Sequence, residues 1–293
     1  MFKSGFVNII GRPNVGKSTL MNALVGEKMS ITTFKPQTTR HRIQGILNGK
    51  DFQVVFSDTP GYVHDPAYKM HEKMNRYVFS TFEDADILIL LIEHKDKYAP
   101  DHPLIQALSK SSCPVFLVIN KIDLISNEDV ILLIEKWKER MAFAEIVPVS
   151  ALHQSNTELL RSLIIKYLPE GPVYYPQDQL SDRSERFFVS EMIREQIFLQ
   201  YKQEIPYSSE VAIESFKETE DLIRIEALIF VNRKTQKSIL IGKGGSAIKK
   251  LGTEARKQLE NFLRKKVFLE IRVKVRENWR DNESLLDKLG YGQ

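Results

Sequence analysis

The sequence predicts an α/β fold with a mostly parallel sheet, followed by a smaller α+β domain. Short apolar runs alternate with stretches of helical spacing over residues 1–168, a pattern typical of parallel strands joined by helices. A segment rich in proline and glycine interrupts this pattern at residues 169–176 and predicts a domain boundary. Beyond it, two runs of alternating apolar residues between helical stretches predict an antiparallel hairpin.

The composition is that of a soluble globular protein. Of the 293 residues, 42% are hydrophobic and 27% are charged. Cys113 is the only cysteine, which excludes a disulfide framework and fits a reducing compartment such as the cytoplasm. No apolar run approaches the ~20 residues that span a bilayer, and the first residues lead directly into a strand. We therefore expect neither a membrane helix nor a signal peptide.

Positive charge is concentrated near the C-terminal end. The formal net charge is +4, but Val231–Arg276 holds 14 lysines and arginines against three glutamates. The rest of the chain is therefore net negative. A basic segment of this kind indicates a surface that binds a polyanion.

The first predicted strand, Gly5–Ile10, and the first predicted helix, Thr19–Val25, flank the sequence GRPNVGKS. This is the phosphate-binding pattern G-x-x-x-x-G-K-S, whose backbone N–H groups and helix N-terminus point at phosphate oxygens. Lys17 is expected to reach the β- and γ-phosphates, and Ser18 to ligate Mg²⁺. The predicted phosphate-binding residues are Gly11, Asn14, Val15, Gly16, Lys17, Ser18, Thr19 and Gly61.

Further strands and helices complete the first predicted domain. Continuous apolar runs such as ILILLI fit strands that are buried on both faces. The strands are expected at Arg42–Asn48, Phe52–Ser57, Ile87–Ile92, Val115–Ile119 and Ile146–Val149. The helices are expected at Leu104–Ser109, Val130–Met141 and Thr157–Leu168. Because ligands bind at the carboxyl ends of parallel strands, the polar motifs that follow these strands are candidate site residues.

Two motifs follow successive strands. Asp58-Thr59-Pro60-Gly61 by itself is an ordinary turn, but after a phosphate-binding loop it predicts that Asp58 holds Mg²⁺ and that the Gly61 N–H senses the γ-phosphate. Asp123, in Asn120-Lys121-Ile122-Asp123, can accept two hydrogen bonds from guanine N1–H and N2–H₂, whereas adenine would leave the carboxylate unpaired. The predicted guanine-binding residues are Asn120, Lys121, Asp123, Ser150, Ala151 and Leu152, with the Ala151 N–H directed at guanine O6.

Two stretches, Glu27–His41 and Tyr62–Asn75, are candidate switches that respond to the γ-phosphate. An ordinary loop is the alternative for the first of them. Tyr62 stands where many GTPases carry a glutamine that orients the attacking water, so slow intrinsic hydrolysis is expected. The predicted switch residues are Thr38, Thr39, Asp58, Thr59, Pro60, Gly61 and Tyr62.

The predicted organisation is a GTPase domain at 1–168, a proline-rich linker at 169–182, and a second domain at 183–293. Ser181-Asp182 is expected to cap the first helix of the second domain. In order, the expected elements are a helix at Arg183–Tyr201, strands at Val211–Lys217 and Leu222–Val231, helices at Gln236–Ile241 and Ser246–Arg264, and a strand at Val267–Val275. Trp279, in the tail, is expected to be a packing anchor.

Gly242-Lys243-Gly244-Gly245 resembles the GXXG loop of KH domains, and the order of elements around it matches the type II arrangement. The glycines let the backbone approach a sugar-phosphate chain. Leu240 is expected to join the floor of an apolar groove. A turn without RNA contacts is the alternative. The predicted RNA-binding residues are Ile241, Gly242, Lys243, Gly244, Gly245, Ile248, Lys249, Lys250 and Arg256.

Taken together, GRPNVGKS, QTTRH at 37–41, DTPG, NKID and SAL resemble the bacterial Era family of GTPases, in motif order and domain order. The resemblance implies Mg²⁺ held by Ser18, Thr39 and Asp58, with Thr38 as the alternative to Thr39, and it admits K⁺ at Asn14. It also implies GTP and GDP as ligands, the 3′ end of 16S ribosomal RNA and the 30S subunit as partners, and a monomeric cytoplasmic protein with loose membrane attachment.

Two other functions stay open at the level of sequence. One is an RNA-binding module whose GTPase is vestigial or purely regulatory; intact Lys17, Ser18, Asp58 and Gly61 argue against it. The other is a GTPase that acts in tRNA modification or at the membrane, which does not need a C-terminal GXXG domain. The expected function is therefore a GTP-hydrolysing switch that binds ribosomal RNA and assists assembly of the small subunit.

Overall fold

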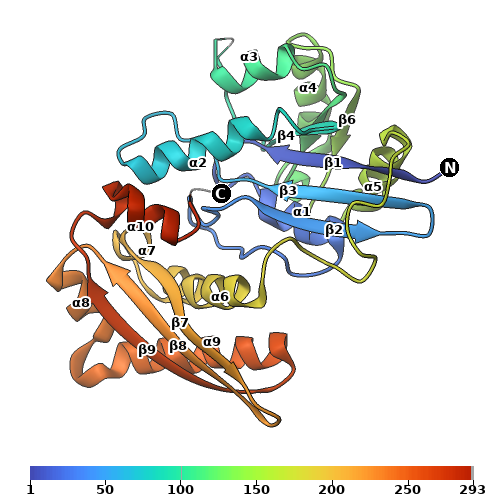
Figure 1. The fold of residues 1–293 in the computed structure, drawn as a ribbon. Helices are drawn as coiled ribbons and strands as arrows, with labels where there is room; N and C mark the ends of the chain where they lie inside the picture. Colours follow the sequence, from blue (N-terminus) through green and yellow to red (C-terminus); the bar gives the residue numbers. More distant parts are fainter. Residues whose placement is uncertain (100, 292–293) are drawn as a thin grey trace. The chain divides into compact units, whose positions relative to one another are not determined.

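The computed structural model describes residues 1–99 and 101–291, and the chain divides into two compact units (Figure 1). The first unit comprises Met1–Ser30, Thr39–Asp65 and Met74–Asp182. The second comprises Ile31–Thr38, Pro66–Lys73 and Arg183–Gln293. Two short segments from the N-terminal part of the chain therefore group with the C-terminal residues.

The first unit is built on a six-stranded sheet of order β2-β3-β1-β4-β5-β6. Only the edge strand β2 runs antiparallel to its neighbour, so the prediction of a mostly parallel sheet is confirmed. The strands are β1 (Lys3–Ile10), β2 (Ile43–Asn48), β3 (Phe52–Asp58), β4 (Ile87–Ile92), β5 (Val115–Ile119) and β6 (Glu145–Pro148).

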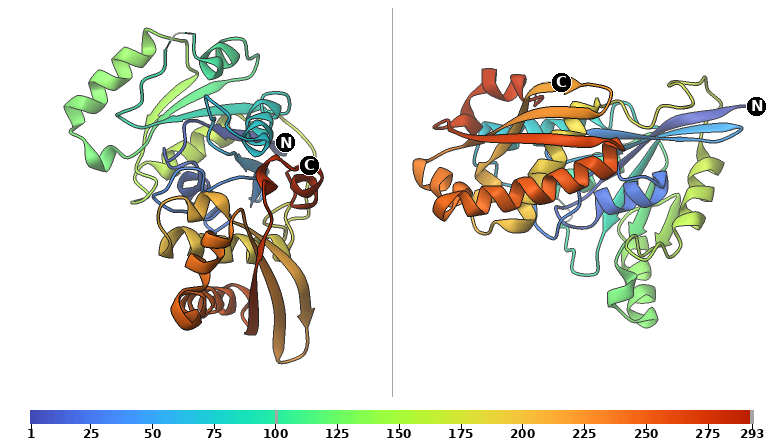
Figure 2. Two further views of the ribbon diagram at one scale, coloured as in Figure 1. Left: turned by 90° about the vertical axis from the view of Figure 1, so that its left-hand side faces the viewer. Right: turned by 90° about the horizontal axis from the view of Figure 1, so that it is seen from below.

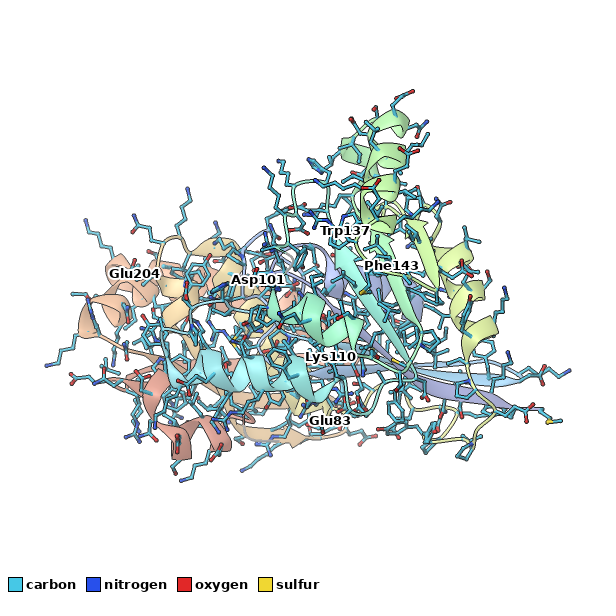
Figure 3. All side chains as sticks on the ribbon, turned by 90° about the horizontal axis from the view of Figure 1, so that it is seen from above. Glu83, Asp101, Lys110, Trp137, Phe143 and Glu204 are labelled. Atoms are coloured by element: carbon cyan, nitrogen blue, oxygen red, sulfur yellow. The ribbon has the colours of Figure 1, made fainter. Side chains whose placement is uncertain are left out.

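Helices cover both faces of this sheet (Figure 1). Residues of α2, α3 and α4 form one core with the strands, in which the ring centroids of Trp137 and Phe143 lie 6.2 Å apart (Figure 3). Helices α1 and α5 pack on the other face. The helices are α1 (Lys17–Val25), α2 (Lys69–Ser80), α3 (Pro103–Ser109), α4 (Asn127–Lys138) and α5 (Thr157–Tyr167), with a 3₁₀ turn at Ile122–Leu124.

Helix α2 was not predicted. Its sequence is largely polar, and its first part falls in a stretch interpreted as a mobile switch. The buried residues Met70, Met74, Tyr77 and Val78 nevertheless recur at helical spacing. That spacing is the signal that could have identified the helix.

The segment predicted as a linker, residues 169–182, belongs to the first unit. The Ile46 N–H donates to the Leu180 carbonyl oxygen at 2.9 Å. Ser181 Oγ donates to the Gln44 carbonyl oxygen, and the Gln44 N–H donates to Asp182 Oδ1 at 3.1 Å. The predicted cap is therefore wrong: Ser181 and Asp182 bond to the β2 edge, and Ser184 stands at the N-cap of α6, without a side-chain cap bond.

The second unit contains a three-stranded sheet of order β7-β8-β9. The predicted hairpin is confirmed as the antiparallel pair β7 and β8, and β9 runs parallel to β8. Helices α6, α8 and α9 contribute to one core with these strands, and α9 runs along one face of the sheet (Figure 2). The elements are α6 (Glu185–Gln200), α7 (Ile205–Ser208), β7 (Glu210–Glu218), β8 (Leu222–Val231), α8 (Lys234–Ile241), α9 (Ser246–Leu263), β9 (Lys266–Val275) and α10 (Glu283–Lys288), with 3₁₀ turns at Lys243–Gly245 and Trp279–Asp281.

The C-terminal tail is anchored inside the second unit. Trp279 is fully buried, and its indole N–H donates to the Ser208 carbonyl oxygen at 2.9 Å. The expectation that Trp279 is a packing anchor is thus confirmed. Near the end of the tail, the buried Tyr291 donates its hydroxyl proton to Glu210 Oε2.

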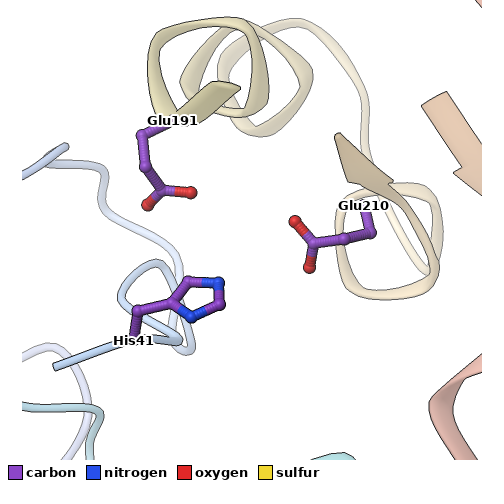
Figure 4. Close-up of side chains that lie close together, drawn as sticks. All are labelled: His41, Glu191 and Glu210. Atoms are coloured by element: carbon purple, nitrogen blue, oxygen red, sulfur yellow. The ribbon is translucent and has the colours of Figure 1, made fainter. Parts of the chain in front are cut away.

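Two buried carboxylates of the second unit have partners within it. Glu191 on α6 accepts hydrogen bonds from the guanidinium of Arg194, which lies one turn further along the helix. Glu210, at the start of β7, accepts the bond from Tyr291. Figure 4 draws both carboxylates. The hydrogen bonds from Arg194 and Tyr291 offset the cost of burying these two carboxylates.

Replacement of the buried indole should destabilise the second unit. Because Trp279→Ala removes a fully buried side chain and its hydrogen bond, the free energy of unfolding should fall by about 3–5 kcal/mol. Urea unfolding followed by circular dichroism measures the change. The matched control is Leu199→Ala, at a side chain that is 54% exposed, which should cost about 0.5 kcal/mol or less. Equal losses in the two variants would contradict the anchoring role.

Candidate functional site: a nucleotide centre and a GXXG loop

The phosphate-binding loop joins β1 to α1, and its two glycines occupy places where a side chain does not fit. At Gly16, φ is 100°, and a Cβ would lie 2.3 Å from Asn120 Nδ2. At Gly11, a Cβ would lie 2.4 Å from the Leu91 carbonyl oxygen. Helix α1 begins at Lys17, so the positive end of its dipole lies at the loop.

The side chain of Lys17, the first residue of α1, is buried and contacts the loop. Its Nζ donates to the carbonyl oxygens of Gly11 and Arg12, at 3.2 and 2.9 Å. Burial lowers the pKa of Lys17 to about 8, and the nearby Asp58 carboxylate opposes this shift. The lysine is thus held at the place from which it could reach phosphate oxygens.

Ser18, Thr39 and Asp58 converge at one point. Ser18 Oγ donates to Asp58 Oδ2 at 2.6 Å and lies 2.8 Å from Thr39 Oγ1. Thr39 Oγ1 donates to the same carboxylate oxygen at 3.3 Å. The other oxygen, Asp58 Oδ1, is buried and has no hydrogen-bond partner within residues 1–99 and 101–291, and burial raises the pKa of this carboxyl. Clustered oxygen ligands around a buried carboxylate suit a hard cation such as Mg²⁺.

The neighbouring threonine points elsewhere. Thr38 belongs to the second unit, where its Oγ1 lies 2.6 Å from Thr33 Oγ1 and 2.7 Å from the Lys35 carbonyl oxygen. The structure therefore brings Thr39, and not Thr38, to Ser18 and Asp58.

The residues after Asp58 lie against the phosphate-binding loop. Thr59 Oγ1 donates to the Ile9 carbonyl oxygen at 2.9 Å. A Cβ at Gly61 would lie 2.6 Å from the backbone of Pro13, which explains the requirement for glycine there. The Tyr62 ring makes edge contacts with Phe79 and His102. Pro60, which follows Thr59 in the sequence, is also buried.

The predicted guanine-binding residues come from the loops after β5 and β6. Asn120 Nδ2 donates to the Val15 carbonyl oxygen at 2.8 Å, and Ser150 Oγ donates to Asp123 Oδ1. Lys121 Nζ donates to the Asn14 carbonyl oxygen at 2.7 Å and lies 2.6 Å from Glu93 Oε2. These bonds join the base motif to the phosphate-binding loop.

One donor predicted for the base site is bonded within the protein. The Ala151 N–H, expected to point at guanine O6, donates instead to Asn120 Oδ1 at 3.0 Å. The Ala151 N–H is therefore bonded to the buried side-chain amide of Asn120 in this structure. The Leu152 side chain is 70% exposed.

The two candidate switch stretches are each divided between the units. Inside the second unit, the Thr32 N–H donates to Glu195 Oε1 at 3.1 Å, and Lys35 Nζ donates to the carbonyl oxygens of Phe198 and Tyr201. In the same unit, Lys69 forms an ion pair with Glu283 at 2.9 Å. Polar residues of these stretches, which predicted mobile loops, therefore form specific hydrogen bonds and an ion pair in the second unit.

The GXXG segment lies between α8 and α9 in the second unit. Gly244 and Gly245 have φ values of 60° and 78° with open space at the Cβ position, whereas a Cβ at Gly242 would lie 2.7 Å from Ala247 Cβ. Four of the predicted RNA-binding residues are exposed cations, Lys243 in the loop and Lys249, Lys250 and Arg256 on α9. The loop thus presents an open backbone bordered by positive charge.

The apolar residues beside the loop are more buried than predicted. Leu240 is fully buried in the core of the unit, so its assignment to a groove floor is wrong. It faces the core because α8 packs its apolar side against the sheet. Ile241 and Ile248 are partly buried and pack against the same core.

The sequence matches known families in both parts. The family described as "50S ribosome-binding GTPase" matches residues 6–121, and the KH domain family matches residues 204–280. The GTPase Era of Syntrophus aciditrophicus is 47% identical over 296 residues, which cover 100% of this chain and 96% of that protein. The chain belongs to the Era family of GTPases. The expected fold, a P-loop GTPase domain followed by a KH domain, is confirmed.

Other Era proteins agree along the whole length. The GTPase Era of Clostridium kluyveri is 46% identical over 293 residues, covering 99% of this chain and all of that protein. A crystal structure of Era with MgGDPNP and a fragment of 16S ribosomal RNA superposes with a TM-score of 0.94 at 36% identity, covering 100% of both chains. A tyrosine-to-alanine variant of Aquifex aeolicus Era bound to GDP and aluminium fluoride gives the same values. As an Era GTPase, the chain hydrolyses GTP.

Sequence reasoning missed Glu93 as a partner of the base motif in this Era protein. Glu93 follows β4 directly and lies 2.6 Å from Lys121 Nζ. The rule that polar residues at strand ends gather at one edge of a parallel sheet was applied to the other strands, and it could have identified Glu93.

A side chain at Gly16 should disturb the site. In Gly16→Ala, the Cβ would collide with Asn120 Nδ2 at 2.3 Å, so we expect the affinity for GDP to fall by about tenfold or more. Titration with a fluorescent GDP measures this change.

The control is Gly26→Ala, which also has a positive φ, of 88°, but has no atom within 4 Å of its Cβ position. It should cost about 1–2 kcal/mol of stability and leave GDP affinity unchanged. Similar affinities in the two variants would contradict an effect of the Gly16 collision on GDP binding.

Proposed function

We propose that this Era GTPase is a switch that binds the 3′ end of 16S ribosomal RNA through its KH domain and assists assembly of the 30S subunit. The main support is the likeness over the full length of both chains to an Era protein solved with MgGDPNP and a fragment of that RNA. The open GXXG backbone and its four exposed cations support the same proposal.

We propose Ser18, Thr39 and Asp58 as the residues that hold Mg²⁺. Their oxygens converge within hydrogen-bond distance, and Asp58 Oδ1 is buried without a partner in the described part of the chain. Mg²⁺ would supply charge neutralisation at the β- and γ-phosphates. Lys17, Gly11 and Gly16 would orient the phosphates through the loop that they form.

A potassium ion at Asn14 is a further part of this proposal. Asn14 is exposed in the loop, and its backbone φ of 67° is unusual for a residue other than glycine. Its side chain is therefore available to a cation beside the phosphates. No glutamine follows Gly61, so another source of positive charge would be useful for hydrolysis. Turnover in KCl faster than in NaCl of equal ionic strength would support the ion.

The nucleotide state is proposed to act on the RNA-binding unit through the switch stretches. The support is that Ile31–Thr38 and Pro66–Lys73 group with the second unit, whereas Thr39 and Gly61 group with the first. Peripheral membrane attachment stays an expectation of the family resemblance. Within the described residues, no helix has the length and apolar character needed to cross a membrane.

Asp123 should decide the base preference. In Asp123→Asn, the amide can donate a hydrogen bond, which fits the 2-oxo group of xanthine better than the N2–H₂ of guanine. We expect the affinity for GTP to fall by about 100-fold or more, with a gain in the affinity for xanthosine triphosphate. Competition against a fluorescent nucleotide measures both. Retention of the GTP preference would contradict the proposed base contact.

Gly244 should decide RNA affinity. Asn adopts positive φ more readily than most residues, so Gly244→Asn and Gly244→Asp differ mainly by one negative charge. Because the space at this glycine is open, both should fold. We expect Gly244→Asp to bind a single-stranded 3′ fragment of 16S ribosomal RNA at least about fivefold more weakly than Gly244→Asn.

Fluorescence anisotropy at fixed salt, with GDPNP and with GDP, measures this difference. Identical affinities in the two Gly244 variants would argue against phosphate contacts at the loop. Absence of RNA binding by the unmodified chain in either nucleotide state would refute the proposed function.

A further inference from the structure

The segment that follows β4 contacts the start of the phosphate-binding loop. Tyr98 is 2% exposed, and its Oη accepts a hydrogen bond from the backbone N–H of Arg12 at 3.2 Å. The guanidinium carbon of Arg12 lies over the same ring, 4.6 Å from its centroid. One tyrosine thus contacts both the backbone and the side chain of the second residue in GRPNVGKS.

Other groups of this segment bind the same arginine. The Arg12 guanidinium donates to the Lys97 carbonyl oxygen and lies 3.9 Å from Asp96 Oδ1. Asp96 is itself fixed, because its Oδ2 accepts the Glu93 N–H at 2.9 Å. The Arg12 side chain is therefore directed at residues 96–98, and not along the loop toward Lys17.

The segment Glu93–Tyr98 also contacts the base motif. Glu93 Oε2 lies 2.6 Å from Lys121 Nζ, and the same Nζ donates to the Asn14 carbonyl oxygen at 2.7 Å. A closed path of ion pairs and hydrogen bonds therefore runs from Arg12 through Asp96 and Glu93 to Lys121, and back to the phosphate-binding loop at Asn14. The motif after β3 is adjacent, because the His102 ring contacts both Tyr98 and Tyr62.

Tyr98 is rigid enough to position what it touches. Its ring packs at 4.8 Å from His102 and 5.8 Å from Trp137, in the core beside β4. A hydroxyl at the end of a fixed ring is a fixed acceptor, so it limits the orientations of the Arg12 peptide. Loops that are ordered before binding lose less conformational entropy when the ligand binds.

We propose that Glu93–Tyr98 is a positioning segment for the nucleotide site, with Tyr98 as its principal residue. The inference rests on the GTPase activity of the family. Among the described residues, the Tyr98 hydroxyl bonds to the Arg12 N–H and to none of the predicted phosphate-binding groups, so it acts through the loop. Its loss should weaken nucleotide binding in the ground state and the transition state alike, which raises KM and leaves kcat nearly unchanged.

The decisive variant is Tyr98→Phe, which keeps the packed ring and removes only the acceptor for the Arg12 N–H. We expect a fluorescent GDP to dissociate about three- to tenfold faster, which is the range that corresponds to one hydrogen bond. KM for GTP should rise by a similar factor with kcat within about twofold. The melting temperature should change by less than about 2 °C.

The matched control is Tyr167→Phe, which removes a hydroxyl that donates to Glu145 Oε1 at 3.1 Å. Glu145 is the first residue of β6, so this bond lies at the end of the sheet opposite to the loop motifs. It should leave GDP dissociation unchanged. GDP dissociation from Tyr98→Phe within twofold of the control would overturn the proposal. A fall in melting temperature of more than about 5 °C with faster dissociation would assign Tyr98 to core packing and overturn it too.

The unmodified chain separates this inference from the activity on which it rests. If the unmodified chain turns over GTP and Tyr98→Phe behaves as the control does, only the positioning role is refuted. If the unmodified chain binds no guanine nucleotide, the GTPase activity is refuted, and the inference is refuted with it.

Discussion

The side-chain amide of Asn120 holds three nucleotide-binding loops in one arrangement. It donates to the Val15 carbonyl oxygen and accepts the Ala151 N–H, so the loops after β1, β5 and β6 share one buried group. The space at Gly16 depends on the same amide, since any Cβ there would meet it. A buried amide with both ends bonded tolerates little displacement, because either lost bond would leave a buried polar group unpaired. The geometry of the whole nucleotide centre depends on this constraint.

Around this amide, the charged residues of the centre bond to one another and to the backbone. Lys17 bonds to the loop carbonyls, and Ser18 and Thr39 bond to Asp58. Each of these groups is expected to exchange its present partner for a phosphate oxygen or a cation when GTP binds. The protein scaffold therefore holds these groups in place before the nucleotide binds, and among them the buried oxygen without a partner in the described part of the chain is Asp58 Oδ1, at the proposed cation site.

The sequence predicted most of the fold because the strands are apolar on both faces. ILILLI and VFLVI gave β4 and β5 with their observed limits, and the ends of β1, β3, β5 and β6 led to motifs. Two features escaped prediction for physical reasons, and the choice of Thr39 over its alternative Thr38 rested on the family resemblance alone. Helix α2 is amphipathic within a polar stretch. Thr38 and Thr39 are chemically identical neighbours, so only the backbone direction distinguishes them. Tyr98 and Arg12 are 86 residues apart, and local periodicity carries no information on such pairs.

Thr38 and Thr39 have a consequence for how this part of the chain can vary. Thr38 bonds to Thr33 in one unit, and the next hydroxyl along the chain bonds to Ser18 in the other. Most surface connections accept insertions and deletions. Here, one added or missing residue between Thr33 and Thr38 would move the Thr38 hydroxyl away from its partner within the second unit. The number of residues in this connection, more than their identity, is what the fold holds constant.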